Sequence, residues 1–310
     1  MPIVRRYLPR TPLYRYATLS ARLGFDCWVK HENHLPIGAF KVRGGVNLFA
    51  NLSDRARAQG VITATRGNHG QSIAWAARAF GSRAVIYVPE GNNPEKNSAM
   101  QALGAEIVVF GRDFDAAREE AEAGVERLGL RYVHVANEPL LIAGVGTFGV
   151  EIVEDLPDVD VIIVPMGSGA GASGLVLALR AMRPDAQIVG VQAERAPALA
   201  NSLRAHAITT CPSADTVADG LATRTAYELT FSILDGALSD VVLVSEQEIR
   251  DGIRLALETT HNVAEGAAGA AYAAAYKLRS RFAGQRVVVV HTGQNIDRDT
   301  LRWVLLDFSA

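Results

Sequence analysis

The chain has 310 residues and a formal net charge of -2 at pH 7, so its charge gives no basis for expecting nucleic acid or an anionic membrane surface as a partner. Hydrophobic residues make up 49%, as in a well-buried globular protein, yet no apolar run is long enough to span a membrane. Cys27 and Cys211 lack metal-site or redox spacing, and the residues after Met1 lack the apolar core of a signal peptide. We therefore expect a cytoplasmic protein.

The first half of the chain predicts short strands that alternate with helices. Residues 1–35 are expected to be irregular, apart from a turn at 11–13 and a strand at 27–30. The strands expected after them are 61–65, 84–88, 106–110 and 132–135, and the expected helices are 42–52, 71–80, 97–103, 113–128 and 148–154.

The second half repeats this rhythm. The expected strands are 159–164, 188–191, 241–244 and 287–290, and helices are expected at 175–182, 198–203, 246–258 and 265–281, after 227 and at the C-terminal end. Continuously apolar strands that alternate with helices predict parallel sheets covered on both faces. Because no Pro/Gly/Ser-rich linker marks a boundary, we expect any second lobe to be inserted into the first.

Lys41 stands out because the chain has only four lysines and otherwise uses arginine for its positive charge. It lies between an aromatic residue and small residues, in a glycine-bearing stretch from Pro36 to Gly45. A desolvated lysine loses its proton and attacks carbonyl groups, which arginine cannot do. A solvated loop lysine is the simpler interpretation, and we set it aside only because two distant stretches suit the same cofactor.

The glycine-rich turn from Gly167 to Gly174 follows a buried strand and opens a helix. Its small residues leave successive backbone N–H groups bare at a helix N-terminus, which predicts a phosphate site helped by Ser168 or Ser173. Close packing of strand and helix is the structural alternative. The functional alternative to a phosphate site is a dinucleotide site. The acidic residue that such a site requires after the next strand is present only as a displaced Glu194, and a nucleotide gives Lys41 no role.

A phosphorylated aldehyde accounts for both Lys41 and the phosphate turn. Pyridoxal 5'-phosphate (PLP) needs an amine for a Schiff base, a phosphate site, an apolar ring face and a partner for its ring nitrogen. Phe40 is placed to cover the ring, and Thr292, after the last core strand, is placed to meet the ring nitrogen.

Five motifs in the chain resemble, in order, those of the fold type II (tryptophan-synthase-β-like) PLP enzymes, within the serine/threonine dehydratase and serine racemase group. They are Gly38–Gly45, Arg66–Gln71, Ile142–Thr147, Pro165–Ala170 and Thr292–Asn295. The first resembles the family's Gly-Ser-Phe-Lys-x-Arg-Gly-Ala and the second its Ser-Gly-Asn-His-Gly-Gln. Together they extend over nearly the whole chain, and they are more specific for fold and cofactor than for substrate.

The resemblance implies a two-lobed α/β architecture. The large PLP-binding domain is expected at residues 1–53 plus 146–310, and the inserted small domain at 54–145, with approximate boundaries. Relatives are mostly homodimers, so a homodimer is expected.

The resemblance also implies roles for single residues. Lys41 forms the Schiff base and exchanges the α-proton, Phe40 packs on the ring, Asn68 bonds the ring's phenolic oxygen, and Thr292 faces the ring nitrogen. The phosphate is assigned to Gly167, Ser168, Gly169 and Ala170.

Substrate binding is assigned to the loop before the helix at 71–80. Thr65, Asn68 and His69 line the part that takes the substrate carboxylate; without the motif, His69 would pass for an ordinary histidine at a helix start. Glu265 matches a glutamate near the ring, although an acidic residue at a helix start is also ordinary capping.

Arg66 departs from the family pattern, which usually has serine there. In racemases that serine is the second acid/base, and a guanidinium is a poor base, so weak racemisation is expected. Arg66 is alternatively a ligand for an extra anionic substrate group, such as the distal carboxylate of 3-hydroxyaspartate, or a residue that turns outward to solvent.

Two further departures concern the activating metal and regulation. The group's cation site uses a glutamate followed six residues later by aspartate, and Glu194 here is followed by Ala200, so no metal is predicted. The chain ends soon after Trp303, so we expect no appended regulatory domain.

We therefore expect a PLP-dependent ammonia-lyase that converts a 3-hydroxy amino acid such as L-threonine or L-serine to a 2-oxo acid and ammonia. A hydroxyl-type partner such as Thr292 does not keep the ring nitrogen protonated, which favours prompt loss of the β-substituent. The alternatives are a 3-hydroxyaspartate or phenylserine-type dehydratase, a serine/aspartate-type racemase and a β-replacement enzyme. A non-catalytic PLP- or nicotinamide-binding protein is the remaining possibility.

Overall fold

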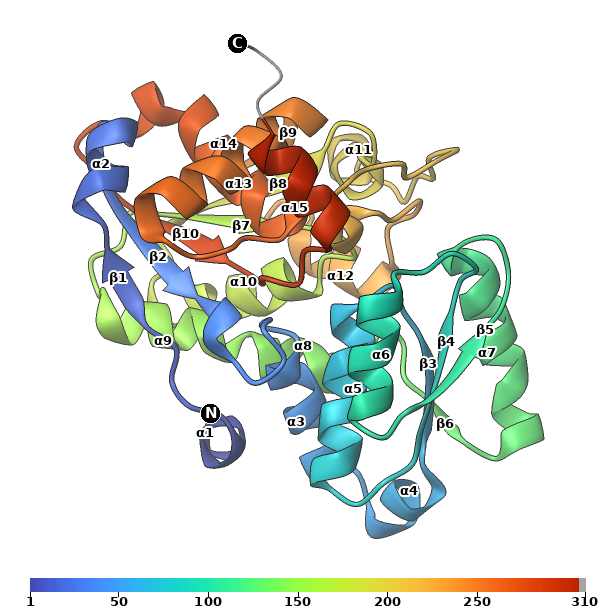
Figure 1. The fold of residues 1–310 in the computed structure, drawn as a ribbon. Coiled ribbons are helices and arrows are strands. Elements are labelled where there is room, and N and C mark those ends of the chain that lie inside the picture. The colour runs from blue at the N-terminus through green and yellow to red at the C-terminus, as the bar shows by residue number, and fades with distance from the viewer. Residues whose placement is uncertain (307–310) are drawn as a thin grey trace. The chain divides into compact units, whose positions relative to one another are not determined.

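A computed structural model describes residues 1–306 of the chain (Figure 1). The chain divides into two compact units, which we describe separately. The first comprises Met1–Pro9 and Lys41–Val145, and the second comprises Arg10–Phe40 and the residues from Gly146 onward. Residues 54–145, predicted as the small domain, lie within the first unit, and the domain boundaries themselves stay a prediction.

The first unit contains a four-stranded parallel sheet in the order β5-β4-β3-β6. Helix α7 packs on one face of the sheet, and α5 and α6 pack on the other (Figure 1). Its elements, in chain order, are α1 (Pro2–Tyr7), α3 (Val42–Asn51), α4 (Asp54–Gln59), β3 (Val61–Ala64), α5 (Asn68–Ala79), β4 (Ala84–Val88), α6 (Pro94–Ala102), β5 (Glu106–Val109), α7 (Phe114–Leu128), β6 (Arg131–Tyr132) and α8 (Pro139–Val145).

The second unit contains a six-stranded sheet in the order β1-β2-β10-β7-β8-β9, parallel except for the edge strand β1. Its strands are β1 (Leu13–Arg15), β2 (Asp26–His31), β7 (Val161–Pro165), β8 (Gln187–Ala193), β9 (Asp240–Val244) and β10 (Arg286–His291). Its α-helices are α2 (Ala17–Leu23), α9 (Thr147–Asp155), α10 (Ala170–Met182), α11 (Ala198–Ala205), α12 (Glu228–Leu234), α13 (Glu246–Thr260), α14 (Gly266–Lys277) and α15 (Arg298–Leu305).

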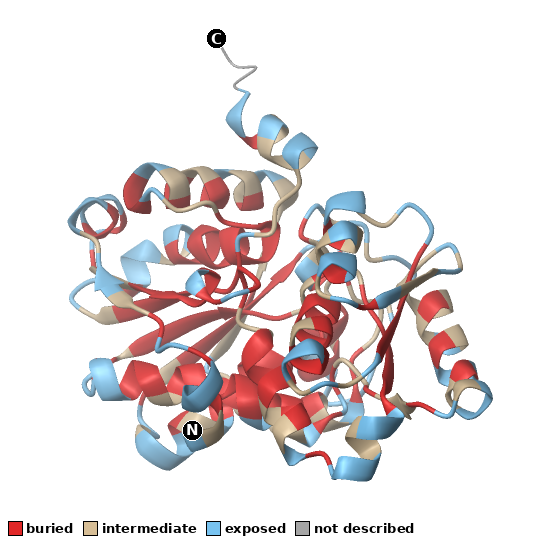
Figure 2. Cartoon of the chain, turned by 60° about the horizontal axis from the view of Figure 1, so that its bottom comes forward, coloured by how far each residue is buried: buried red, intermediate tan, exposed pale blue. Residues whose placement is uncertain are grey.

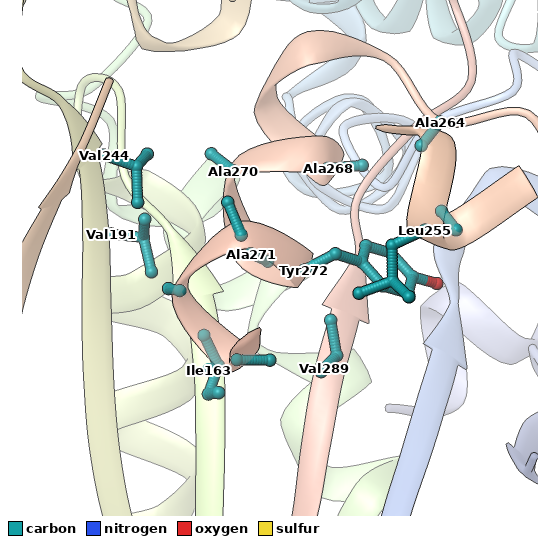
Figure 3. Packing of buried hydrophobic residues seen from close by; sticks show 14 of the residues in the cluster. Ile163, Val191, Val244, Leu255, Ala264, Ala268, Ala270, Ala271, Tyr272 and Val289 are labelled. Atoms are coloured by element: carbon teal, nitrogen blue, oxygen red, sulfur yellow. The ribbon is translucent and has the colours of Figure 1, made fainter. Parts of the chain in front are cut away.

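Alternate residues of the central strand β7 enter two different cores. Val161 and Ile163 pack with α13 and α14, whereas Ile162 and Val164 pack with α9 and α10. Figure 2 shows the strands of this sheet coloured as buried, with helices on both sides of them. Figure 3 shows the first core, to which α14 contributes small side chains such as Ala271 and the sheet contributes Ile163 and Val289. Burial on both faces explains why the strands are apolar throughout.

The mainly parallel α/β fold confirms the prediction from the sequence, but the expectation of an irregular segment at 1–35 was wrong. That segment contains α1, β1 and α2 besides the expected strand. Helix α1 begins with Pro2, whose missing N–H costs nothing at a first helical position, and α2 ends at Gly24 with φ 76°. These elements are too short for clear periodicity. Among residues 1–306, no helix is long and apolar enough to cross a membrane.

Candidate active site

The turn between β7 and α10 presents backbone donors without a capping side chain. Gly169, the N-cap residue, has φ 89° and makes no side-chain cap hydrogen bond, so the first turn of this 13-residue helix keeps its N–H groups for another acceptor. Ser173 is fully buried, and its hydroxyl has no hydrogen-bond partner among the described residues. Residues 166–174 include no charged side chain. These features fit a bound phosphate.

The same glycines also permit close packing, which was the structural alternative. A Cβ at Gly167 would lie 2.0 Å from the carbonyl oxygen of Gly220, and a Cβ at Gly171 would lie 3.0 Å from Cε2 of Phe40. The second contact shows that the Phe40 ring lies directly against the first turn of α10. Packing and anion binding therefore make compatible demands on this turn.

Thr292 is held beside Phe40 through the backbone. The Phe40 N–H donates to the Thr292 carbonyl at 3.0 Å, and Ala39 forms an antiparallel bridge with Gly293. Thr292 is only 3% exposed, and its hydroxyl is without a partner in the described part of the chain. The second unit thus brings together the α10 turn, Phe40 and a buried, available hydroxyl.

Glu265 lies next to this loop. Its N–H donates to the carbonyl of Gly293 at 3.0 Å, and a Cβ at Gly293 would lie 2.5 Å from Oε1 of Glu265. Glu265 is the N-cap residue of α14, yet its side chain makes no capping hydrogen bond. Ordinary capping therefore does not explain this buried carboxylate.

Lys41 follows Phe40 in the chain and is the N-cap residue of α3 in the first unit. A Cβ at Gly45 would lie 2.6 Å from the carbonyl oxygen of Ser72, so the backbones of α3 and α5 approach closely there. The Ser72 hydroxyl also donates to the carbonyl of Lys41 at 2.6 Å. The glycine at position 45 therefore allows α3 to present Lys41 beside α5.

The loop before α5 uses its backbone donors internally. The buried Thr65 hydroxyl accepts from the N–H of Gly67 at 3.0 Å and of Gly70 at 3.1 Å. The loop carries Arg66, which is half-buried, and α5 begins at Asn68. Thr65, Arg66 and Asn68 are thus assembled in one turn, with Thr65 shaping it.

His69 is buried and neutral. The Thr63 hydroxyl donates to the carbonyl of Val133 at 2.7 Å, so at 2.9 Å it accepts from Nε2 of His69. Burial lowers the pKa of His69 to about 3, helped by the positive charge of Lys41 and by His134. The Lys41 charge therefore acts on His69 within the first unit.

The sequence reasoning missed Thr63 and Lys96. Lys96, on α6, is only 9% exposed, and its Cδ lies 2.9 Å from where a Cβ on Gly67 would be. The rarity of lysine in this chain was a usable signal for Lys96. Thr63 gave none, because a threonine inside a strand is ordinary.

Glu194 and Ala200 are the positions that correspond to the family's cation site. Position 200 is an alanine and supplies no carboxylate, and Oε1 of Glu194 lies 3.9 Å from Nζ of Lys277. Across residues 1–306, no group of three or more His, Cys, Asp or Glu side chains is placed to hold a metal ion.

Comparison with known proteins identifies the family. A family model described as pyridoxal-phosphate dependent enzyme matches residues 4–293, most of the chain. The chain belongs to this family. An L-threonine ammonia-lyase of Thermotoga maritima is 39% identical to this PLP enzyme over 294 residues, which are 95% of this chain and 73% of the relative. The resemblance inferred from the motifs, the cofactor family included, is thereby confirmed.

Solved structures confirm the fold type. Threonine deaminase isoform 2 of Solanum lycopersicum has a TM-score of 0.92 and 31% identity to this PLP enzyme, covering 97% of this chain and 89% of that one. Maize serine racemase has the same TM-score at 28% identity, covering 97% and 93%. Dehydratases and racemases thus share this architecture, so the substrate has to be argued from the residues.

Proposed function

We propose that the chain is an ammonia-lyase that converts a 3-hydroxy amino acid, such as L-threonine or L-serine, to a 2-oxo acid and ammonia. The observation that carries this proposal is the second unit's arrangement of the uncapped α10 turn, the Phe40 ring and the buried Thr292 hydroxyl. Lys41 follows Phe40 directly in the chain. The printed function of the Thermotoga maritima relative supports the same reaction.

The proposed cofactor contacts follow from these positions. Gly167, Ser168, Gly169 and Ala170, with the Ser173 hydroxyl, would hold the phosphate of PLP. Phe40 would cover the ring and Thr292 would meet the ring nitrogen, with Glu265 near it. When bound, PLP supplies an electron sink for the substrate's α-carbon.

Lys41 would supply the primary amine that links to PLP and, once released, removes the α-proton. The proton that Lys41 removes would then be available to the 3-hydroxyl, which would leave as water. Hydrolysis of the resulting enamine would give the 2-oxo acid and ammonia. The uncharged hydroxyl of Thr292 favours this prompt elimination, because it does not keep the ring nitrogen protonated as a carboxylate would.

The substrate carboxylate would be bound by the loop that Thr65 shapes, with Asn68 and His69 at the start of α5. His69 is a poor candidate for an acid at neutral pH, since burial lowers its pKa to about 3. Its ring instead supports the loop through Thr63. Asn68 would also bond the phenolic oxygen of PLP.

The activity is tested with purified protein and PLP. L-Threonine should yield 2-oxobutanoate and L-serine pyruvate, each in equal amounts with ammonia. Lys41→Ala should abolish both reactions, whereas Lys277→Arg, a change at a surface ion pair, should leave them unchanged. Chiral analysis of recovered serine tests racemisation, and an added thiol tests β-replacement. PLP binding without turnover of any amino acid would contradict the proposal.

A second candidate substrate class is a 3-hydroxy amino acid with a distal acidic group, such as 3-hydroxyaspartate. It is favoured by the position of Lys96. The side-chain stem of Lys96 packs on Gly67, the residue that separates Arg66 from Asn68 in the chain. The cationic side chain of Lys96, from α6, thus lies beside the loop that carries Arg66, and an additional carboxylate is a suitable ligand for a guanidinium.

Arg66→Ser and Lys96→Met decide between these substrate classes. If the distal-acid proposal holds, each variant lowers kcat/KM for 3-hydroxyaspartate about tenfold or more and changes the values for serine and threonine little. Equal loss on all three substrates would eliminate the distal-carboxylate role. Arg66→Ser also tests weak racemisation, because a serine there would be expected to increase it.

The homodimer remains a proposal that rests on the family resemblance. Light scattering of the purified protein tests it, and a mass near twice 33.2 kDa would support a dimer.

A further inference from the structure

Two buried histidines lie beside the loop formed by residues 292–295. His31 ends β2 and His291 ends β10, and the two residues are paired in register across these parallel strands. Both are 0% exposed, and their ring centroids are 5.7 Å apart. Neither has a role in the proposed reaction. A fully buried imidazole requires hydrogen-bond partners, so those partners indicate what each ring supports.

The bonds of His291 define its tautomer. Its Nε2 lies 3.1 Å from the carbonyl oxygen of Val263, and its Nδ1 lies 3.0 Å from the hydroxyl of Tyr272. Burial lowers the pKa of His291 to about 3, so the ring is neutral at pH 7 and carries one proton. Because a carbonyl only accepts, that proton is on Nε2, and Nδ1 accepts from Tyr272.

The bonds of His31 form a chain with one direction. Asn33 donates from Nδ2 to Oε1 of Gln294 at 3.3 Å and to Oδ1 of Asn262 at 3.2 Å, so its own Oδ1 is an acceptor. His31 Nδ1 lies 3.2 Å from that oxygen and therefore donates, while Nε2 accepts from the Tyr16 hydroxyl at 2.8 Å. The chain runs from Tyr16 through His31 and Asn33 to Gln294.

Both chains of hydrogen bonds end on the same loop. Gln294 lies two residues after Thr292, and His291 lies immediately before Thr292. Val263, held by His291, lies two residues before Glu265, whose N–H is bonded to Gly293. His31 therefore holds the loop through the side chain of Gln294, and His291 holds the segment that carries Glu265.

Proton conduction is the rival interpretation, since His34 is exposed and stacks on His31 with ring centroids 4.8 Å apart. The Asn33 amide argues against it. This amide lies between His31 and Gln294 and has no readily ionisable proton, so a proton cannot pass along the chain to the loop. A network of this kind orients groups instead.

We propose that His31 and His291 are positioning residues that hold the Thr292 hydroxyl and the Glu265 carboxylate where the PLP ring is proposed to bind. This inference rests on the proposed function. Substitution of either histidine should leave the catalytic amine of Lys41 intact and loosen the ring site.

The network itself is tested first without PLP. In ¹⁵N-histidine-labelled apoprotein at pH 7, NMR should show the proton on Nδ1 of His31 and on Nε2 of His291. A charged ring, or the opposite tautomer in either histidine, would overturn the network.

The consequence is tested by titrating PLP into variants. His31→Phe should raise the dissociation constant of PLP about tenfold (~1.4 kcal/mol) and shift the visible absorption of the bound cofactor. Gln294→Ala removes only the exposed side chain at the end of the hydrogen-bond chain, so it should raise the dissociation constant of PLP about threefold. His206→Asn, at a surface helix end where asparagine also tolerates the left-handed backbone, is the matched control and should change neither.

The outcomes separate the two proposals. Unchanged PLP affinity and spectrum in folded variants would overturn the positioning role and leave the proposed function standing. A wild-type protein that does not bind PLP would overturn both. If His31→Phe does not fold, Gln294→Ala decides the question, because that side chain lies at the surface.

Discussion

The loop before α5 and the loop before α10 have the same construction but use their backbone differently. Each follows a buried strand, and in each the helix N-cap is a glycine without a side-chain cap. In the α5 loop, the Thr65 hydroxyl occupies the N–H groups of Gly67 and Gly70. After the α10 loop, the Ser173 hydroxyl near the start of the helix has no partner among the described residues.

The two loops also differ in the charge of their side chains. The α5 loop carries Arg66, Asn68 and His69, whereas residues 166–174 include no charged group. A loop that satisfies its own donors can specialise in side-chain recognition, and one that keeps its donors can bind an anion through the backbone. This contrast supports assigning the amino acid to the α5 loop and the phosphate to the α10 loop.

The largest effect is expected from placing a negative charge in the α10 loop. Ala170→Asp should weaken PLP binding at least about 100-fold, because the carboxylate would repel the phosphate and compete for the same donors. Because Ala170 is only 3% exposed, the buried carboxylate should also lower the stability of the apoprotein, offset in part by its favourable interaction with the helix dipole. PLP titration and urea unfolding measure the two effects, with Ala170→Ser as the control. Unchanged PLP affinity would contradict the phosphate assignment.

Removing the hydroxyl that organises the α5 loop should have the next largest effect. Thr65→Val leaves two buried N–H groups without their acceptor, which should lower the free energy of unfolding by about 1–3 kcal/mol. The KM for the amino acid should rise, while PLP affinity should change little. Thr18→Val, at an exposed position in α2, is the control. Loss of PLP affinity with an unchanged KM would reverse the assignment of the two loops.

Acid should affect the α5 loop through His69. Its pKa is about 3 in the fold and about 6.5 in the unfolded chain, so the unfolded chain binds more protons between these values. The stability is complete above about pH 6.5 and is lost as the pH falls, by about 1.4 kcal/mol per pH unit for this one group. Urea unfolding at pH 6.5 and 5.5 should show a smaller loss in His69→Asn. Equal losses in both proteins would mean that His69 is not held neutral.

The smallest expected effect is that of Ser173→Ala. In the apoprotein this change removes a buried hydroxyl without a partner, so the stability should stay equal or rise. With PLP, it removes a phosphate ligand, so the dissociation constant should increase about threefold to tenfold. Thermal unfolding with and without PLP measures both. A loss of apoprotein stability would show that the hydroxyl is satisfied in the absence of the cofactor.

The sequence predicted what depends on local pattern. Continuous apolar runs identified strands such as β7 and β10, because burial on both faces removes the alternation that a half-exposed strand would show. The glycine-rich turn indicated that a helix follows β7, although α10 begins at Ala170, earlier than the expected 175. The motif around Lys41 indicated the cofactor family. These features are visible because neighbouring residues carry the whole signal.

The features that the sequence did not reveal depend on residues far apart in the chain. His31 and His291 each end an ordinary strand, and only the parallel pairing of β2 and β10 brings them together. Lys96 contacts Gly67 because α6 packs on the α5 loop, a contact that no local spacing predicts. The short elements α1 and α2 were missed because a single helical turn or two gives too little periodicity.

The central claim is that Lys41 carries PLP. The direct measurement is borohydride reduction of the protein with bound PLP, followed by digestion and mass spectrometry. The chain has four lysines, so the possible sites are few. We predict a yellow protein whose reduced adduct is found on Lys41, and a Lys41→Ala variant that gives none. A colourless protein, or an adduct on Lys30, Lys96 or Lys277 in place of Lys41, would contradict the account.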